Sequence, residues 1–327
     1  MRPDYGDVTS EYLALRAGRG YIKGFSEIVW LTGKDAVTFL DGQASQDVAA
    51  MAPEATARSF LLEPRGRLVA LLWLLRGEER VGLVVEQGRG QDVIEHLERF
   101  RFRVDVDMSL DHRGVIEVWG SEITEVAHGA GLDRGAGWID HAGVSVAVLT
   151  GSPLSRLVLA GLSDEAVSRL ALIPAGRIAA DTVRVEAGEP VMGIDVDEAT
   201  IAQESGLVSE AVSFTKGCYV GQELVARIHS RGRVNRRLVG VRMSQNVLPP
   251  PGSQLVAGDA VVGTLSTVGE SLAVRAPVAL AMVRREIEAG DDVVVRWDSH
   301  SIPARVHALP LDDLSGISHS SYTEDRD

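Results

Sequence analysis

The stretch Lys216-Gly217-Cys218-Tyr219-Val220-Gly221-Gln222-Glu223 carries more information about this chain than any other. It contains the only cysteine, placed between two glycines and among side chains that are charged or form hydrogen bonds. A lone cysteine forms no intramolecular disulfide, and it does not supply the several thiolates that hold a structural zinc ion or an iron–sulfur cluster. We therefore expect no metal site in this chain, and any metal cluster chemistry on a partner.

The spacing of apolar residues predicts a helix over residues 217–229, with Cys218 and Gln222 on neighbouring positions of one face. Free backbone N–H groups at the start of such a helix lower the pKa of a thiol, and the charge of Lys216 adds to this effect. Cys218 is therefore a candidate nucleophilic or redox-active thiol. The alternative is a small buried side chain, which is the usual environment of a free cysteine.

The size of the chain predicts two or three packed units, and its single cysteine and its lack of an apolar start fit a reducing cytoplasm. It has 327 residues, of which 45% are hydrophobic, whereas single cores stop growing near 250–300 residues. The first twenty residues carry several charges, and the longest apolar run, Leu68–Leu75, has eight residues. A membrane-spanning helix needs about 20. We expect neither a signal peptide nor a membrane segment.

The charge of the chain argues against direct nucleic-acid binding. The net charge is −13, and phosphate binding depends mainly on lysine and arginine. Glycine-rich phosphate-binding motifs are absent from the sequence, so ATP hydrolysis and Rossmann-type redox chemistry are not expected. One basic cluster remains, either a solvated edge or a site for an anionic ligand that carries carboxylates; it consists of Arg227, His229, Arg231, Arg233, Arg236 and Arg237.

The pattern of apolar residues predicts an α+β organisation. The expected strands are 28–31, 59–62, 68–75, 81–85, 104–108, 115–119, 144–149 and 183–185, and the expected helices are 36–40, 93–100 and a segment capped by Ser163. After residue 237 only short β-rich runs recur, separated by turns that contain proline, glycine and aspartate, which predicts a small β-barrel. Residues 312–327 are polar and acidic and are expected to form a disordered tail.

Glu186 is a second candidate site residue. It follows the predicted strand 183–185 and precedes Ala187-Gly188, where a flat ligand can approach the backbone closely. A carboxylate is a natural partner for paired N–H donors such as those of a 2-amino-4-oxo-pteridine. The alternative is an ordinary ion pair with Arg184 or Arg227.

Together these residues resemble the YgfZ-type folate-binding family, which is related to the glycine-cleavage aminomethyltransferase, or T-protein. The stretch 216–223 matches the signature of that family without a departure. The resemblance covers roughly residues 20–310 and includes Leu31–Ala36 with Phe39-Leu40, Arg184-x-Glu186-Ala187-Gly188, Gly193-x-Asp195, Ala226-Arg227, Gly232 and Arg236-Arg237-Leu238.

The resemblance implies a three-lobed fold and a folate ligand. It implies a central folate-binding domain from residues 1–49 and 151–236, a ferredoxin-like α+β lobe at 50–150, a C-terminal β-barrel at 237–311, and the tail at 312–327. The implied cofactor is tetrahydrofolate or a derivative. The implied partners are iron–sulfur client proteins, including enzymes that modify tRNA, or the machinery that assembles their clusters.

The resemblance also suggests roles for individual residues. Cys218, with Lys216 beside it, is the candidate for the function that is specific to this family. Glu186 is the candidate for binding the pterin. Further binding residues are Tyr219, Gln222, Glu223 and Arg227.

Two other functions remain open from the sequence. The first is aminomethyl transfer to tetrahydrofolate, for which the T-protein carries an aspartate in the strand after a glycine turn. That place falls on Val69 or Ala70 here, which have no carboxylate for proton chemistry, although Glu63 lies nearby. The second is a non-catalytic adaptor that neither binds folate nor depends on the thiol.

Overall fold

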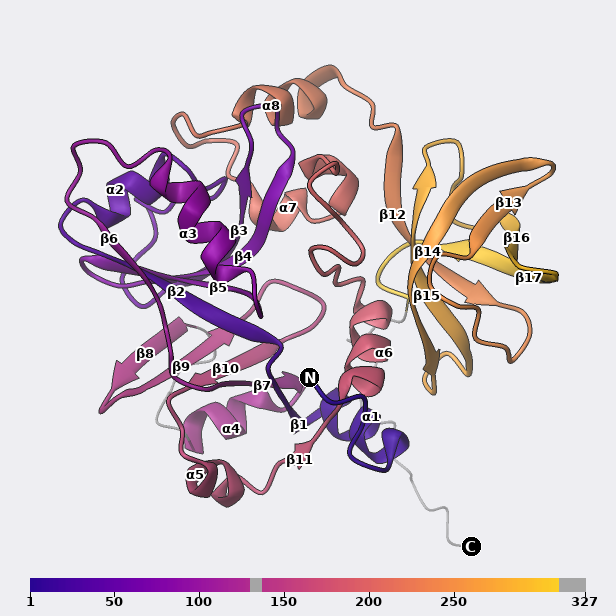
Figure 1. Ribbon diagram of the computed structural model, residues 1–327, viewed down its shortest axis with the longest axis horizontal. Helices are drawn as coiled ribbons and strands as arrows, with labels where there is room; N and C mark the ends of the chain where they lie inside the picture. Colours follow the sequence, from indigo (N-terminus) through magenta and orange to yellow (C-terminus); the bar gives the residue numbers. More distant parts are fainter. Residues whose placement is uncertain (130–136, 312–327) are drawn as a thin grey trace, which may run out of the picture.

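The computed structural model describes residues 1–129 and 137–311. The acidic tail predicted at 312–327 therefore lies outside the described residues, as does the side chain of Arg231. Two β-sheets and a barrel form the framework, and Figure 1 shows the barrel at one end with the two sheets at the other. The mixture of helices and mainly antiparallel strands confirms the expected α+β class.

The first sheet has five antiparallel strands in the order β3-β4-β5-β2-β6. Its strands are β2 (Ser26–Thr32), β3 (Thr56–Leu62), β4 (Leu68–Arg76), β5 (Arg80–Glu86) and β6 (Asp107–Leu110). Helices α2 (Ala36–Asp41) and α3 (Gly90–Glu98) pack on one face through a shared apolar core. Nearly every residue of β4 is buried, which explains its unbroken apolar run, because both faces of this strand are covered.

The second sheet has six strands in the order β11-β1-β7-β10-β9-β8. Its strands are β1 (Ala17–Lys23), β7 (Val115–Gly120), β8 (Gly137–His141), β9 (Val144–Leu149), β10 (Arg156–Ala160) and β11 (Ile173–Pro174). Helices α4 (Ile123–Gly129) and α5 (Asp164–Arg169) belong to this half, and the Ser163 side chain caps α5 as predicted. Trp30 of the first sheet packs against Trp138 of the second, with ring centroids 5.4 Å apart, and Trp73 belongs to the same buried cluster, so the two sheets share a core.

Membership of the two sheets crosses the predicted lobe boundaries. Strand β2, from the segment assigned to the central domain, lies inside the five-stranded sheet, whereas β7 to β9, from the segment 50–150, join the six-stranded sheet. The chain passes from one sheet to the other at Gly24, which has a positive φ of 74°, and Phe25. At this crossing point, Phe25 and Ser26 help to line the cavity described below.

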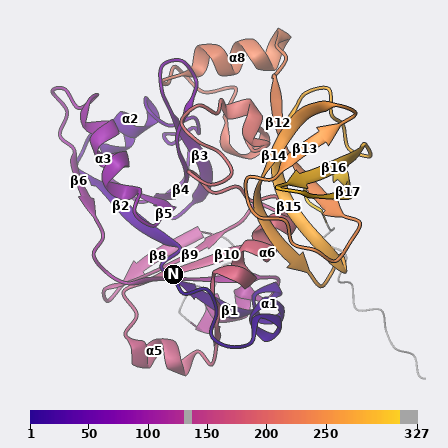
Figure 2. The same ribbon diagram turned by 45° about the vertical axis from the view of Figure 1, so that its right-hand side comes forward.

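The remaining helices lie between the sheets and the barrel or above the first sheet (Figure 2). They are α1 (Val8–Arg16), α6 (Arg177–Ala187), the 3-10 helix η1 (Ala202–Ser205), α7 (Val208–Ala211) and α8 (Gln222–Arg231). Two predictions were wrong here. Residues 183–185 belong to helix α6 and not to a strand, and α8 begins at Gln222, after the left-handed Gly221, and not near residue 217.

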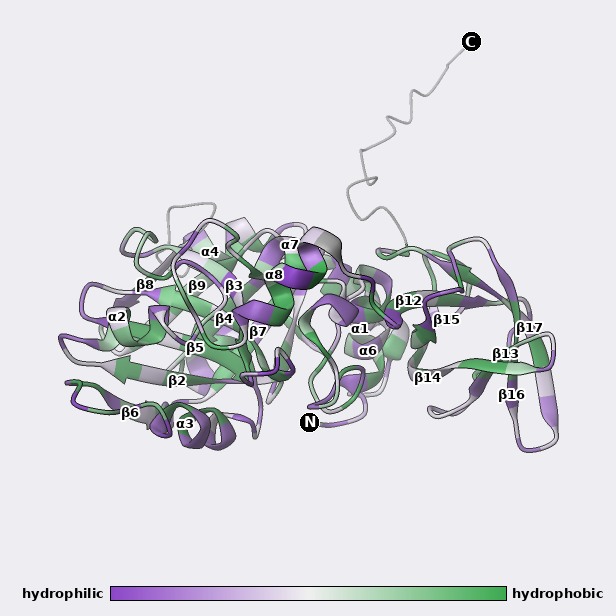
Figure 3. Ribbon diagram, turned by 90° about the horizontal axis from the view of Figure 1, so that it is seen from above, coloured by the Kyte–Doolittle hydropathy of each residue, from purple (hydrophilic) through white to green (hydrophobic). Residues whose placement is uncertain are grey.

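The C-terminal part forms the predicted barrel, which is closed in the order β12-β15-β14-β13-β16-β17. Its strands are β12 (Arg236–Met243), β13 (Gln254–Ala257), β14 (Ala260–Ser271), β15 (Ala276–Arg284), β16 (Asp292–Trp297) and β17 (His300–His307). Helices α1 and α6 stand between this barrel and the sheets (Figure 3). At Gly269 a side chain would meet Thr182 Oγ1 at 2.4 Å, so the glycine lets β14 approach α6 closely. Within residues 1–129 and 137–311, no helix has the length and apolar character needed to cross a membrane.

Candidate functional site

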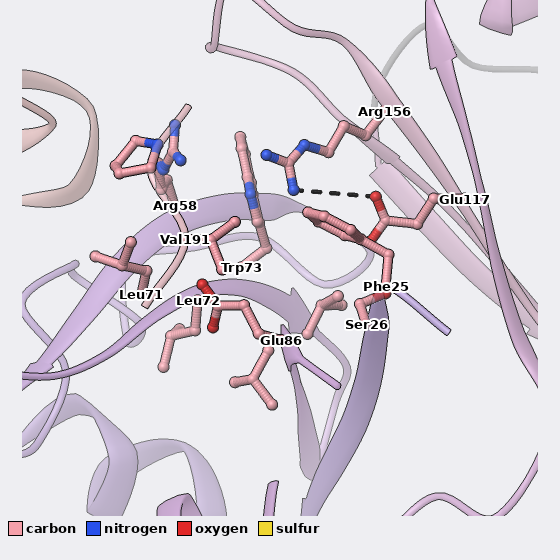
Figure 4. A pocket seen from close by; sticks show the side chains of 13 residues that line it. Phe25, Ser26, Arg58, Leu71, Leu72, Trp73, Glu86, Glu117, Arg156 and Val191 are labelled. Carbon is pink, nitrogen blue, oxygen red and sulfur yellow. Dashed lines mark ion pairs between the residues drawn. The ribbon is translucent and has the colours of Figure 1, made fainter. Parts of the chain in front are cut away.

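A narrow cavity lies where the two sheets meet the segment that follows α6 (Figure 4). Its volume is about 30 Å³, room for roughly one or two water molecules. The lining residues come from both sheets and from the 190–191 segment; they are Phe25, Ser26, Arg58, Leu71, Leu72, Trp73, Val84, Val85, Glu86, Glu117, Arg156, Pro190 and Val191. Most of the wall is apolar, with a few polar groups that converge on it; small-molecule sites have this kind of lining but are roughly ten times larger.

Four of these lining residues carry a buried polar atom that has no hydrogen-bond partner in the described structure. The atoms are Ser26 Oγ, Glu86 Oε2, Glu117 Oε1 and Arg156 Nε. Buried polar groups are almost always paired, because leaving one unpaired costs roughly 1–3 kcal/mol. Their collection around one cavity indicates that they serve a ligand or bound water.

Aromatic rings stand on the walls beside these atoms. Phe25 packs edge-on against Trp119, with ring centroids 4.8 Å apart, and the Arg156 guanidinium lies 5.7 Å from the Phe25 ring centroid. On the other side, the Arg58 guanidinium lies 5.3 Å from the Trp73 ring centroid. These flat groups suit a flat heterocycle. A bicyclic ring is larger than the closed cavity, so its entry requires the walls to separate.

A buried ion network holds the two arginines in place. Arg58 binds Glu189 through both of its terminal nitrogens, and Arg156 Nη2 donates to Glu189 Oε2 at 3.0 Å. Burial alone raises the pKa of Glu189, but the charges of Arg58 and Arg156 outweigh this effect and hold the pKa at about 2. Glu189 is therefore an anion that fixes both guanidinium groups at the wall of the cavity.

Glu86 has a different environment at the end of β5. Its Oε1 accepts a hydrogen bond from the backbone N–H of Met192 at 3.1 Å, and its Oε2 is unpartnered. Burial raises the pKa of Glu86, and the backbone N–H groups of Met192 and of Glu86 itself, together with the more distant charges of Arg156 and Arg89, only partly offset this. Glu117 also has one occupied oxygen, because Trp119 Nε1 donates to its Oε2 at 2.5 Å. Each carboxyl group thus offers one oxygen to the cavity.

The predicted pterin-holding residue, Glu186, lies outside the lining of this cavity. It is fully buried near the end of α6, where Tyr12 Oη donates to Oε1 at 2.7 Å and Arg16 Nη1 donates to Oε2 at 2.9 Å. The alternative of an ion pair therefore describes this carboxylate, although its partner is Arg16 and neither Arg184 nor Arg227. Arg184 instead binds Asp181 and Asp195.

Cys218 is exposed and lies in the loop before α8. Both expectations for its position were wrong, because the thiol is neither on a helix nor a small buried side chain. The helix starts only at Gln222, so Cys218 does not occupy the first turn. An exposed thiol in a loop is accessible to reagents and to partner proteins.

The other residues of the 216–223 stretch mainly shape the loop. The Lys216 side chain is 1% exposed, and its ammonium contacts the carbonyl oxygens of Asp41, Ala44 and Gln46 at 2.6–3.0 Å as well as the Asp41 carboxylate at 3.1 Å. Tyr219 is buried, which raises its pKa to about 12, and its backbone N–H donates to Gln222 Oε1 at 3.1 Å.

Glu223 and Arg227 are exposed on α8. Beyond them, a groove of about 610 Å³ runs between the end of α8 and the barrel. It is lined by basic side chains together with two glutamates; the residues are Gln203, Ile228, His229, Gly232, Arg233, Val234, Arg237, Arg285, Glu286 and Glu288. Part of the predicted basic cluster therefore faces this groove, whereas Arg236 binds Glu204.

The structure thus separates the predicted site residues into two places. Lys216, Cys218 and Tyr219 lie in the loop before α8, Gln222, Glu223 and Arg227 lie on α8 itself, and Glu186 lies on α6; none of them lines the cavity. Sequence reasoning missed all four residues with unpartnered atoms. A weak signal existed, since Glu86 and Glu117 are acidic residues at the end or in the middle of valine-rich strands. Among the described residues there is no group of three or more His, Cys, Asp or Glu side chains suited to a metal ion.

Comparison with known proteins gives the fold a precedent. The crystal structure of the glycine cleavage system aminomethyltransferase T from Bartonella henselae superimposes with a TM-score of 0.84 at 21% identity, over 94% of this chain and 90% of that one. A family model for the glycine cleavage T-protein C-terminal barrel domain matches residues 236–313. The chain therefore has the fold of this aminomethyltransferase, including its C-terminal barrel.

The sequence comparisons reach three kinds of relative at similar identity. The aminomethyltransferase of Rubrobacter xylanophilus is 25% identical over 95% of this chain and 88% of its own length. A mitochondrial iron–sulfur cluster assembly factor homolog of Aspergillus fumigatus is 26% identical over 84% of this chain and 72% of its own. The tRNA-modifying protein YgfZ of Pectobacterium carotovorum is 25% identical over 69% of this chain and 70% of its own.

Proposed function

We propose that this chain binds tetrahydrofolate or a derivative and supports the assembly or repair of iron–sulfur proteins, including enzymes that modify tRNA. One observation carries the folate part: four unpartnered buried polar atoms surround a cavity with aromatic walls, in a chain with the fold of a glycine cleavage system aminomethyltransferase. Carboxyl oxygens, a guanidinium N–H and a hydroxyl together match the mixed donors and acceptors of a pteridine ring.

The ring is proposed to lie in this cavity with Glu117 Oε1 and Glu86 Oε2 as acceptors for its N–H groups. Arg156 Nε supplies a donor, and the Glu189 network keeps that guanidinium in place. Glu186 is proposed to act at a distance, through the position of α6, since both of its oxygens are bound by Tyr12 and Arg16.

The iron–sulfur part of the proposal rests on the exposed thiol and on two groups of relatives. Cys218 is accessible in a loop that Lys216, Tyr219 and Gln222 hold in shape. An exposed thiol is suited to contact a client protein or its cluster. The assembly factor homolog and the tRNA-modifying protein, at 25–26% identity, favour this role. Glu223 and Arg227, exposed on the helix that follows, are proposed to contribute to the same surface or to a folate tail.

Aminomethyl transfer is the second candidate function, and two observations favour it. The aminomethyltransferase relatives align over nearly the whole chain, and the cavity contains a buried carboxyl group, Glu86, that the sequence did not predict. Against it, β4 places Val69 and Ala70 where a carboxylate is expected, and neither exchanges a proton. A non-catalytic adaptor is the third candidate, and the unpartnered polar atoms argue against it.

Calorimetric titration with tetrahydrofolate and 5-formyltetrahydrofolate tests the folate part. We expect wild type and Cys218→Ser to bind alike and Glu117→Ala to bind weakly. A one-carbon transfer assay on the same samples separates the second candidate, because turnover that is indifferent to Cys218→Ser favours a transferase. Absence of folate binding by the folded wild type overturns the proposal and favours the adaptor.

A further inference from the structure

The buried carboxyl group of Glu86 suggests a property beyond ligand capture. Its Oε2 is buried and unpartnered at a cavity wall made largely of Leu71, Leu72, Val84 and Val85. The Met192 N–H donates to its Oε1, and the backbone N–H of Glu86 itself also favours the charged form. Among the ion pairs of the described residues, none includes Glu86. A carboxylate buried in this way is costly, whereas the neutral acid is tolerated.

The charged groups around Glu86 are already matched with other partners. On β10, Arg156 Nη2 donates to Glu189, and its Nη1 lies 3.9 Å from Glu117 on β7. On the loop after β5, Arg89 binds Glu198 at 2.6 Å and Asp92 at 3.3 Å.

The same holds on the remaining sides of the cavity. Arg58 on β3 binds Glu189 and Glu210, and Ser26 on β2 is uncharged. The parts of β4 and of the 190–191 segment that line the cavity contribute no titratable side chain. No cation is therefore paired directly with Glu86 among the described residues, and the charges of Arg156 and Arg89, which have other partners, offset the burial of its carboxylate only in part.

We propose that Glu86 is a ligand-controlled proton site: it is the neutral acid in the empty cavity and becomes a carboxylate when a ring N–H of the ligand occupies Oε2. This rests on the proposed folate function and adds proton-linked binding to it. The O–H bond of Glu86 breaks, its proton passes to solvent, and the ligand keeps its own proton while its N–H donates to the new carboxylate. Burial raises the pKa of Glu86, which agrees with a neutral acid in the cavity before the ligand binds.

The gain in energy that drives proton release is the charge-assisted hydrogen bond. An N–H···carboxylate bond is stronger than one between neutral groups, and exclusion of water from the closed cavity strengthens it further. The required ligand class is a heterocycle with N–H donors on its edge, and a pteridine ring fits this description. A ligand without such a donor is expected to bind without releasing the Glu86 proton.

The first arm of the test uses the ligand-free protein. Carboxyl carbon NMR of wild type and Glu86→Gln, with glutamate labelled, assigns the Glu86 signal by its absence from the variant. We expect it to titrate above the range of the exposed glutamates. A midpoint within that ordinary range overturns the proposal.

The second arm measures protons by calorimetry with 5-formyltetrahydrofolate at one pH in two buffers of different ionisation enthalpy. Wild type should release the proton fraction that the NMR titration finds on free Glu86, and Glu86→Gln should release almost none. Glu27→Gln is the matched control, because Glu27 is a buried carboxyl group whose oxygens are taken by Gln87 and the Gly90 N–H, outside the cavity. If Glu86→Gln does not fold, Glu86→Asp should retain the release.

The outcomes separate the two proposals. Folate binding without proton release overturns this inference alone and leaves the folate function intact. Failure of the folded wild type to bind any reduced folate overturns the folate function, and with it proton-linked binding. Release of the same proton fraction by wild type and Glu86→Gln assigns the proton to another group and also overturns the inference.

Discussion

The Lys216 ammonium donates to the backbone carbonyl of Asp41 at 2.6 Å, at the C-terminal end of α2, 175 positions away in the sequence. Two more carbonyl oxygens, of Ala44 and Gln46, lie within 3.0 Å of the same nitrogen. A cation at this place satisfies carbonyl groups that a helix end leaves without partners. Lys216 therefore ties the loop of the exposed thiol to the first sheet region.

Lys216→Met is expected to destabilise the protein, because it leaves several buried carbonyl oxygens without a donor. A loss of roughly 2–4 kcal/mol in the free energy of unfolding follows from the usual cost of such groups. Urea denaturation measures it. Lys34→Met is the control, since Lys34 is 70% exposed and its ion pair with Asp105 is long at 3.7 Å. Equal effects of the two substitutions contradict the structural role of Lys216.

Cys218→Ser should leave both stability and folate affinity unchanged, because the thiol is exposed and does not line the cavity. The thiol of the folded wild type should react with iodoacetamide about as completely as that of the denatured protein, as mass spectrometry would show. A thiol that reacts only after denaturation is incompatible with the exposed loop. Loss of iron–sulfur enzyme activity in cells carrying Cys218→Ser, with folding intact, would assign the thiol its proposed task.

Glu189 makes stability depend on acid pH. Its pKa in the folded protein is about 2, below the ordinary value of 4.5, so the carboxylate stabilises the fold above about pH 4.5 and this contribution is lost as the pH falls toward 2. The contribution is roughly 3 kcal/mol at neutral pH. Glu189→Gln should lower stability at pH 7 and flatten the loss of stability below pH 4.5 in urea titrations. Glu165→Gln should do neither, because the Glu165 side chain, which pairs with Arg169, is 76% exposed.

Substitutions of Glu117 and Glu186 should affect different properties, folate affinity in the first case and stability in the second. Glu117→Ala removes an acceptor from the cavity, so the Kd for 5-formyltetrahydrofolate should rise about tenfold or more. Glu186→Ala leaves Tyr12 and Arg16 without their buried partner, so the melting temperature should fall more than the affinity. Calorimetry and thermal melting of both variants decide this. A large loss of affinity in Glu186→Ala, with stability retained, would return that residue to the ring site.

The parts of this fold that were predicted are those with local signals. The run Leu68–Leu75 became β4, Ser163 capped α5, and the turn-rich β segments after residue 237 closed into a barrel. Helix α6 was mistaken for a strand because Arg184 and Glu186 are buried within it. Buried charges break the apolar stripe on which helix recognition depends.

The cavity was not predictable for a different reason. Ser26, Glu86, Glu117 and Arg156 come from four strands in two sheets, and their missing partners become visible only when those sheets are packed together. The sequence shows a carboxylate, but its protonation and availability depend on neighbours that are distant in the chain. The 216–223 stretch was recognised, but its predicted helical conformation was wrong, because α8 begins at Gln222 and leaves Cys218 in the preceding loop.

Two glycines of that stretch give the last prediction, because only one of them is required by its surroundings. Gly221 has a φ of 84°, and a Cβ there would lie 2.7 Å from the Glu63 carbonyl oxygen and 2.8 Å from Leu62 Cβ. Gly217 has open space in that direction and no positive φ. Gly221→Ala should therefore cost roughly 1–3 kcal/mol in the free energy of unfolding, because left-handed backbone and a backbone clash combine.

Gly217→Ala, the same chemical change four positions earlier, should leave stability within about 0.5 kcal/mol of wild type. Urea denaturation of the two variants measures the difference, and iodoacetamide labelling of Cys218 then reports on the loop itself. Displacement of the loop by Gly221→Ala should change the labelling rate of the thiol while Gly217→Ala leaves it alone. Equal stability of the two variants would contradict the close packing of Gly221 against Leu62 and Glu63 at the β3–β4 turn.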